Sequence, residues 1–335
     1  MTRGRNTGHN LQARKDLFWK ILFFAGLFTV CYGFYFATEQ VDYIWRWHRV
    51  PQYFIYHDEV EIRAEIEGEV SSITTKDGES IVVVHGANTS EQYKVPAKGL
   101  DVSKGDTIYM GDILGHYQEW KPGLFIQGLY LTMQLSIMGI IFGILLGLFT
   151  GLARISRNPA LKWGSITYIE LIRGSPLLVQ IMIWYFVVGT LINGLLTKSG
   201  LPEIPSTWFG IASLAIFAGA YVAEIVRAGI QSVHKGQMEA ARSLGMPTAT
   251  AMRKIVLPQA FKRILPPLAG QFISLIKDSS LLGVIAIREL TKATREGVTT
   301  SLMPYELWLM CGLLYLVITF SLSMFVQYLE RRMVE

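Results

Sequence analysis

The stretch Lys235-Gly-Gln-Met-Glu-Ala-Ala-Arg-Ser-Leu-Gly245 is a short polar interruption between long apolar segments, and it organises the rest of the chain around it. Its middle is rich in helix formers, and Gly245 can adopt the positive φ that ends a helix. Pro247 can start a second helix, and Pro258 is expected to follow the end of that helix. The pattern predicts a helix, a turn and a helix. Taken alone, it fits a partner-docking loop and an ordinary surface hairpin equally well.

The composition is that of a membrane protein. Of 335 residues, 51% are hydrophobic and 17% are charged, whereas soluble proteins carry roughly 25% charged residues. The basic residues lie beside hydrophobic segments and do not alternate with aromatic ones, so no nucleic-acid partner is expected. Cys31 and Cys311 both lie in apolar runs, so neither a disulfide framework nor a metal site built on CxxC is expected.

Six segments are long and apolar enough to cross a bilayer, which requires about 20 residues each. The third and fifth contain charges and prolines, so their ends are less well defined than the others. The six segments are 17–37, 124–153, a part of 163–196, a part of 208–233, about 264–287, and 307–329.

The distribution of charge predicts the orientation. Basic residues precede the first span and fill the loops between the second and third spans and between the fourth and fifth, so these segments should be cytoplasmic. Residues 38–121 carry 15 acidic against 8 basic side chains and should lie outside. Both termini and the 235–258 loop are then cytoplasmic. The first span is longer than a signal peptide's apolar core and lacks a small-x-small exit, which favours an anchor over a cleaved signal.

The external segment 38–122 changes to strand chemistry. Residues 60–67 alternate apolar and polar side chains, Ile81-Val-Val-Val84 is β-branched, and turns are expected at Asp77-Gly78 and Lys104-Gly105. These signals predict a small all-β domain over about 59–117. Its V-x-K-G-D-x-x-x-x-G-D-x-L pattern resembles the barrel-sandwich hybrid fold of biotinyl and lipoyl domains, but that family's modifiable lysine has no counterpart here. A docking element and a structural decoration both remain open.

The second span carries Gly139, Gly143, Gly147 and Gly151 at intervals of four residues, which places all four on one helix face. Small residues at this spacing permit close approach of another helix. We expect tight packing within the subunit, with a seam between two copies as the alternative.

Polar residues interrupt the later spans. Glu170 and Arg173 are spaced to pair, and so are Glu224 and Arg227. Gly174 and Pro176 should interrupt the helix, which frees backbone groups that a packed helix or a watery cavity must satisfy. The alternative is an interfacial turn that precedes the span proper.

The fifth span contains Lys277, Asp278, Ser279 and Ser280, the most polar patch within any span. A patch with both charges and hydroxyl groups suits a zwitterionic solute. An internal ion pair that fixes helix packing would use the same residues.

Glu239-Ala-Ala241, Gly245 and the later Leu257-Pro258 resemble the EAA loop of ABC importer membrane subunits. Residues 169–180, 220–230 and 271–281 resemble, in the same order, permease subunits of polar amino acid ABC importers, the histidine/glutamine/glutamate group. The resemblance covers about residues 124–332. It implies an all-α polytopic membrane protein with a type I ABC importer transmembrane domain of five spans. This chain adds the first span and the β insert.

The resemblance also implies the function, the partners and the location. A binding protein outside delivers a polar amino acid to a pair of permeases, identical or paralogous, in a bacterial inner membrane. Two ATPase subunits bind the cytoplasmic loops. The chain contains no G-x-x-x-x-G-K-[ST] phosphate loop, so it should not be an enzyme, and ATP and Mg²⁺ belong to the partner. The expected ATPase-coupling residues are Glu239, Ala240, Ala241, Gly245, Leu257 and Pro258. The expected substrate-pathway residues are Arg173, Glu224, Lys277, Asp278, Ser279 and Ser280.

The predicted organisation is a cytoplasmic tail (1–16), a first span (17–37), an external insert (38–122) and a permease core (123–335). Two other functions remain open. One is a secondary amino acid carrier or channel that works without ATP. The other is a membrane-anchored scaffold for the β domain. The sequence leaves the transported amino acid open.

Overall fold

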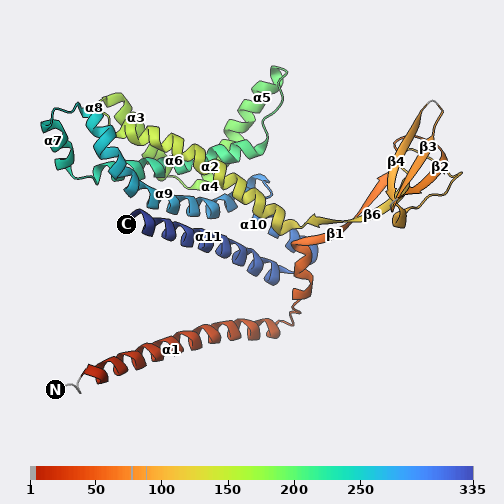
Figure 1. Ribbon diagram of the computed structural model, residues 1–335, viewed down its shortest axis with the longest axis horizontal. Coiled ribbons are helices and arrows are strands. Elements are labelled where there is room, and N and C mark those ends of the chain that lie inside the picture. Colours follow the sequence, from red (N-terminus) through yellow and green to blue (C-terminus); the bar gives the residue numbers. More distant parts are fainter. Residues whose placement is uncertain (1–4, 77, 88, 335) are drawn as a thin grey trace. The chain divides into compact units, whose positions relative to one another are not determined.

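The computed structural model describes residues 5–76, 78–87 and 89–334 (Figure 1). It divides into two units, Met1–His48 and Arg49–Glu335. The first four residues of the predicted tail, including Arg3, lie outside the described residues, as does Asp77 of the predicted Asp77-Gly78 turn. Six helical segments in the described chain are long and apolar enough to span a membrane, in agreement with the sequence.

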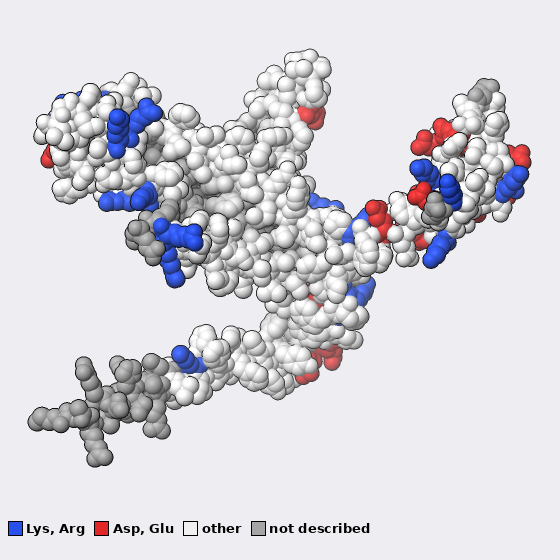
Figure 2. Space-filling model, in the orientation of Figure 1, with Lys and Arg blue, Asp and Glu red and all other residues white. Residues whose placement is uncertain are grey.

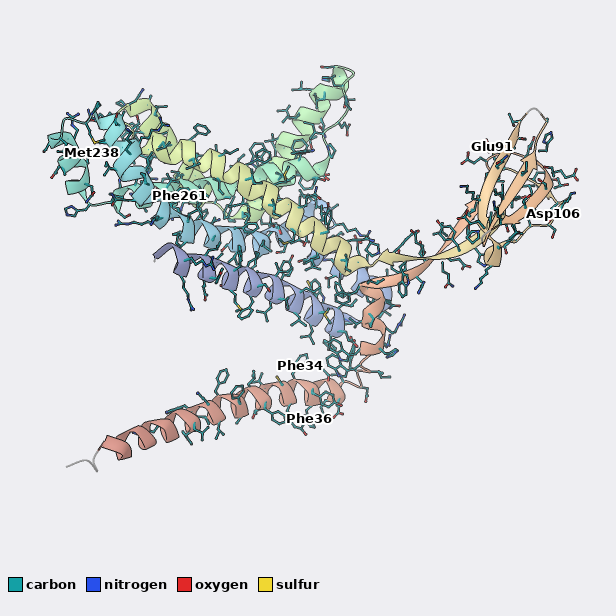
Figure 3. All side chains as sticks on the ribbon, in the orientation of Figure 1. Phe34, Phe36, Glu91, Asp106, Met238 and Phe261 are labelled. Atoms are coloured by element: carbon teal, nitrogen blue, oxygen red, sulfur yellow. The ribbon has the colours of Figure 1, made fainter. Side chains whose placement is uncertain are left out.

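The first unit is built on one long helix, α1 (Arg5–Gln40), which extends beyond the predicted span at both ends. Its apolar stretch is Leu17–Gln40, and large apolar side chains such as Phe34 and Phe36 are exposed (Figure 3). After the helix, the Trp45 ring lies edge-on to Phe34 and stacks on Trp47, and its Nε1 donates to the Thr38 hydroxyl at 3.1 Å. Tryptophan and tyrosine rings commonly gather at a membrane–water interface, so this cluster marks one end of the span.

The β insert contains two antiparallel sheets. A ribbon pairs the first and last strands, and a four-stranded sheet has the order β4-β3-β2-β5. Val70, Val82, Val84, Val95 and Leu114 are fully buried, as expected for alternating strands with one face turned inward. The elements are the 3₁₀ helix η1 (Trp47–Tyr53), β1 (Ile55–Arg63), β2 (Gly68–Lys76), β3 (Glu79–His85), β4 (Ser90–Pro96), the 3₁₀ helix η2 (Ala97–Gly99), β5 (Thr107–Ile108) and β6 (Ile113–Pro122).

The helical core follows the β ribbon directly. Its elements are α2 (Leu124–Arg154), α3 (Pro159–Arg173), α4 (Leu177–Met182), a π-helical turn η3 (Ile183–Gly189), α5 (Thr190–Lys198), α6 (Ser206–Gln231), α7 (Lys235–Ser243), α8 (Thr248–Ala251), a second π-helical turn η4 (Met252–Val256), α9 (Leu257–Asp278), the 3₁₀ helix η5 (Ser279–Ile285), α10 (Leu290–Ser301) and α11 (Pro304–Val334).

The third span begins at Leu177. The predicted break at Gly174 and Pro176 is present and separates α3 as a helix of its own. Two carbonyl groups at the break accept from the side chain of the buried Gln180. Its amide nitrogen lies 2.7 Å from the Ile172 oxygen and 3.1 Å from the Ser175 oxygen. A buried amide thus supplies the hydrogen bonds that the bilayer cannot.

The expectation that Pro258 follows the end of a helix is wrong. Pro258 lies in the first turn of α9, and helical residues continue from Thr248 to Ile285. The π-helical turn η4 ends at Val256, immediately before α9. Proline is tolerated in the first turn of a helix, and a wider turn before it relieves the clash between its ring and the backbone of the preceding turn.

The glycine face of α2 packs against α6 within the chain. A methyl group added at Gly143 would lie 2.8 Å from the Ala218 Cβ, and one at Gly147 would lie 2.5 Å from the Val222 Cβ. Both distances are shorter than van der Waals contact, so only glycine permits this approach. The predicted packing within the subunit is confirmed for these residues.

A buried glutamate fixes the start of α10. Glu289 is fully buried, and its two carboxylate oxygens accept from the Thr291 and Lys292 backbone N–H groups at 2.7 and 2.8 Å. The Tyr315 hydroxyl of α11 donates to the same carboxylate at 3.1 Å. Burial raises the pKa of the Glu289 carboxyl above its ordinary value, although the two N–H donors oppose that shift.

Gly147→Ala should destabilise the core. The added methyl group must displace α6, and overpacking of this kind costs about 1–3 kcal/mol. Gly312→Ala in α11 is the matched control, because a methyl group there meets nothing within 4 Å. Thermal unfolding in detergent should show a lower midpoint for the first variant and an unchanged or higher midpoint for the second. Equal midpoints would contradict the packing account.

Glu289 should make stability depend on pH. Because the pKa of its carboxyl is raised in the folded chain above the ordinary 4.5, the folded state binds the proton more tightly than the unfolded state. The contribution is greatest below pH 4.5 and is lost as pH rises through the raised pKa. Glu289→Gln should flatten the fall of the unfolding midpoint with rising pH. An unchanged slope in Glu289→Gln would refute this assignment.

Candidate functional site

The polar loop identified from the sequence folds as two helices joined at a glycine. The His234 ring nitrogen Nδ1 caps α7 by accepting from the Gly236 N–H at 3.1 Å. At the other end, the Met246 N–H donates to the Ala241 carbonyl at 3.1 Å, and Gly245 adopts φ +82°. A methyl group at Gly245 would meet nothing within 4 Å. The positive φ, and not space, is therefore what requires glycine there.

One face of α7 packs on the helical core. Ala241 is buried, and Met238 packs against the main hydrophobic cluster (Figure 3). The Gln259 side-chain amide of α9 donates to Gln237 Oε1 at 3.3 Å. The short loop is thus attached to the spans by apolar and polar contacts. The hydrogen bond between Gln259 and Gln237 joins α7 to the first turn of α9.

The opposite face of α7 is open. Glu239 and Ala240 are exposed, and Leu244 is 84% exposed. From the sequence, we expected the same coupling role for both alanines. In the structure, Ala241 faces the core and Ala240 faces outward. Leu244 was missed, although a leucine at the end of an otherwise polar helix was a usable signal. His234 was also missed, because histidine is an uncommon N-cap residue.

Leu257 and Pro258 lie at the start of α9 and not in the exposed turn. Leu257 packs against the main hydrophobic cluster, while Pro258 is exposed. Basic side chains gather around this end of the core (Figure 2). Those on the loop and its flanks are Lys235, Arg242, Arg253, Lys254, Lys262 and Arg263.

The predicted Glu224–Arg227 pair forms within α6, with an Arg227 nitrogen 2.8 Å from the Glu224 carboxylate. The other Glu224 oxygen lies 2.5 Å from an Arg154 nitrogen at the end of α2. These three side chains are each less than one-third exposed. Arg154 was not predicted as a site residue, because its partner lies 70 positions further along the chain. The network joins the C-terminal end of α2 to α6.

A cavity of about 500 Å³ lies beside this network. Arg173, Glu224, Arg227 and Arg263 are among its lining residues. Arg173 does not pair with Glu170, and its guanidinium carbon lies 5.4 Å from the centre of the Tyr221 ring. Arg263 donates to the Ser232 carbonyl at the end of α6. The predicted residues Arg173 and Glu224 are thus brought to one cavity.

The predicted patch in the fifth span is divided by the helix. Lys277 is exposed and Asp278 is half-buried, and residues adjacent in a helix do not face each other. Ser279 is buried and donates to the Ile276 carbonyl at 2.8 Å. Ser280 is half-buried. None of these four residues lines the cavity at Glu224. Within the residues that the structure describes, no group of His, Cys, Asp and Glu could hold a metal ion.

Comparison with known proteins identifies the core. Residues 139–335 match the family described as binding-protein-dependent transport system inner membrane component. The probable glutamine ABC transporter permease protein GlnM of Bacillus subtilis (strain 168) is 39% identical over 210 residues, covering 63% of this chain and 93% of GlnM. The L-cystine transport system permease protein TcyB of the same organism is 37% identical over 207 residues, covering 62% of this chain and 85% of TcyB.

A solved structure of an amino acid ABC transporter with histidines has a chain 42% identical to this one, with a TM-score of 0.56, covering 62% of this chain and 94% of that one. The sequence matches and the shared helical arrangement agree with each other. The chain belongs to the family of binding-protein-dependent transport system inner membrane components, the permease subunits of ABC transporters.

Proposed function

We propose that this chain is the permease subunit of an ATP-driven importer that translocates polar amino acids delivered by an external binding protein. The observation that carries the proposal is the α7–Gly245–α8 loop, with one face seated on the spans and the other open. Relatives that carry glutamine or cystine in their names support an amino acid as the substrate. Because those two names differ, they leave the side chain of the transported amino acid open.

The open face of α7 is the surface that we assign to a separate ATPase. Glu239, Ala240 and Leu244 offer a carboxylate, a small side chain and an exposed apolar side chain within two turns. Gly245 sets the direction in which α8 leaves. The partner supplies ATP and Mg²⁺, since this sequence contains no phosphate loop. We assign Leu257 and Pro258 an indirect role, in which they fix the start of α9 and do not contact the ATPase.

Coupling then follows from the attachment of the loop. Closure of the ATPases moves α7, and Met238 and Gln237 carry that movement into the main hydrophobic cluster and into α9. The Arg154–Glu224–Arg227 network ties α6 to α2, so these helices move together. Two permease copies, identical or paralogous, would enclose the pathway between them.

The cavity at Glu224 is the part of the pathway that we assign to the core. It places Arg173 and Glu224 on one space of about 500 Å³, so both signs of charge face it. An amino acid carries both signs and can be matched by such a cavity. Lys277, Asp278 and Ser280 lie further along α9 and η5, and we assign them to another level of the pathway. Ser279 is a positioning residue, because its hydroxyl group is used within the helix.

The proposal also covers the orientation of the chain in the membrane and the organisation of the β insert. Basic side chains around α7 and α8 support a cytoplasmic loop in a bacterial inner membrane, with both termini on the same side. The segment 38–122 is external. Within it, residues 59–117 form a domain that we compare to the barrel-sandwich hybrid, on the basis of the paired turns at Gly105 and Gly111, each with φ +95°. The core is then 123–335.

Gly245→Val should uncouple transport. A β-branched residue at positive φ is strained by roughly 1–2 kcal/mol, which depopulates the loop geometry about tenfold. Gly200→Val is the matched control, because Gly200 also has positive φ (+71°) and open space but lies in the loop between α5 and α6. ATPase activity stimulated by substrate and binding protein, measured in proteoliposomes, should be lost in the first variant and kept in the second.

Both variants should insert in the membrane to the same extent, which is checked by their yield after membrane extraction. If Gly245→Val showed coupled uptake equal to that of Gly200→Val, the loop would have no role in coupling. Uptake that persists without any ATPase would instead favour an ATP-independent carrier.

A further inference from the structure

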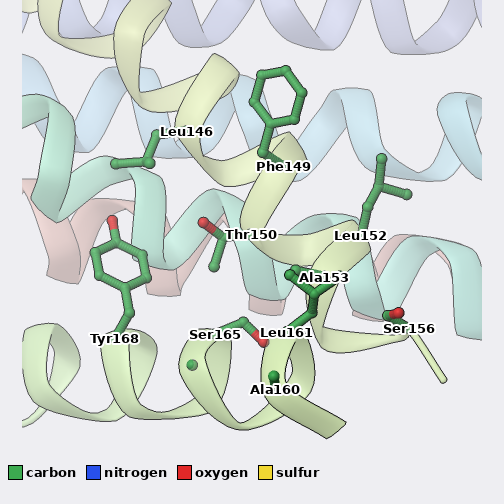
Figure 4. A pocket seen from close by; sticks show the side chains of 11 residues that line it. Leu146, Phe149, Thr150, Leu152, Ala153, Ser156, Ala160, Leu161, Ser165 and Tyr168 are labelled. Carbon is green, nitrogen blue, oxygen red and sulfur yellow. The ribbon is translucent and has the colours of Figure 1, made fainter. Parts of the chain in front are cut away.

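An apolar groove of about 650 Å³ lies between the C-terminal half of α2 and the separate helix α3 (Figure 4). From α2, Leu146, Phe149 and Leu152 line it; from α3, Leu161, Gly164 and Tyr168 do so. Figure 4 shows Leu146 and Tyr168 at one end and Ser156 at the other. The groove is distinct from the cavity at Glu224 and shares no lining residue with it.

The groove offers little hydrogen bonding along its length. The Tyr168 hydroxyl donates to the Ile216 carbonyl at 2.6 Å, and the Ser165 hydroxyl donates to the Lys162 carbonyl at 2.8 Å. Of the four hydroxyl-bearing residues that line the groove, Tyr168 and Ser165 are therefore engaged within the chain; Thr150 and Ser156 are the other two. A methyl group at Gly164 would meet nothing within 4 Å, and Phe149 is 74% exposed. The walls suit an apolar chain and not a polar solute.

Two basic residues are adjacent in sequence to residues that line the Ser156 end of the groove. Arg157 and Lys162 flank the lining residues Ser156 and Leu161, are exposed, and form no ion pair within the described part of the chain. The 15-residue helix α3 begins here, with the Asn158 side chain accepting from the Ala160 N–H at 2.9 Å. Its positive dipole end adds to the two cations.

Trp163 stands beside Lys162 and is 67% exposed. Tryptophan next to a basic residue is typical of the headgroup region of a bilayer. An apolar groove that opens toward basic side chains at that level is complementary to one class of molecule with an apolar tail and an anionic head.

We propose that the groove between α2 and α3 binds an anionic phospholipid, with one acyl chain along its walls and the headgroup phosphate at Arg157 and Lys162. The proposal is independent of the substrate and of the ATPase. In this proposal, α3 forms one wall of a lipid site and does more than connect two spans. The bound lipid fills the space between α3 and α2.

The test uses the full chain purified with its ATPase in detergent, stripped of lipid and then supplied with phosphatidylglycerol or phosphatidylcholine of identical acyl chains. Native mass spectrometry counts the lipids retained. Phosphatidylglycerol should be retained over phosphatidylcholine. Arg157→Gln combined with Lys162→Gln should lower its retention on the order of tenfold, because each basic residue near an anionic lipid contributes to binding. Arg331→Gln combined with Arg332→Gln removes the same charge from the end of α11 and should have no such effect.

The groove itself is tested by filling it. Gly164→Leu should reduce retention of phosphatidylglycerol, and Gly312→Leu, at an equally open glycine of α11, should not. Inorganic phosphate should not displace the lipid, which distinguishes a lipid site from a phosphate site. Should Gly164→Leu fail to fold, the two charge variants decide alone, because they change only exposed side chains.

Equal retention of the two lipids, or no effect of the Arg157 and Lys162 substitutions, would overturn the proposal. It would also be wrong if Gly164→Leu changed the number of chains in the complex but left phosphatidylglycerol bound. In that case, a helix of a second copy fills the groove.

Discussion

The contact between the glycine face of α2 and the middle of α6 is the constraint on which the core depends. At Gly147, the two backbones approach so closely that a single methyl group would overlap Val222. This contact fixes α6 along its length, and α6 leads directly to the turn at His234 and to α7. The position of the exposed loop is therefore set by helix packing within the core.

The same pair of helices carries the charged network. With α2 and α6 in close contact, Arg154 at the end of α2 reaches Glu224, which also holds Arg227. Charged side chains on membrane-spanning helices are costly unless they are paired. The pairing stabilises three charged groups and simultaneously places Glu224 and Arg227 on a cavity. Helix packing, charge burial and the proposed pathway thus use one arrangement.

Local chemistry was predictable from the sequence, and tertiary choices were not. The glycine spacing, the positive φ at Gly245 and the break before Leu177 each follow from a rule that acts within a few residues. Arg154 could not be predicted because its partner is distant in sequence. The different roles of Ala240 and Ala241 depend on which face of α7 meets the core. Pro258 was placed wrongly because the π-helical turn before it has no reliable sequence signal.

In the proposed mechanism, a separate ATPase drives transport by this core through the α7–Gly245–α8 loop. The most direct measurement is amino acid uptake into proteoliposomes that contain the permease and its binding protein, with and without the ATPase and ATP. Uptake against a gradient should occur only when both the ATPase and ATP are present. Concentrative uptake by the permease without the ATPase would contradict this mechanism.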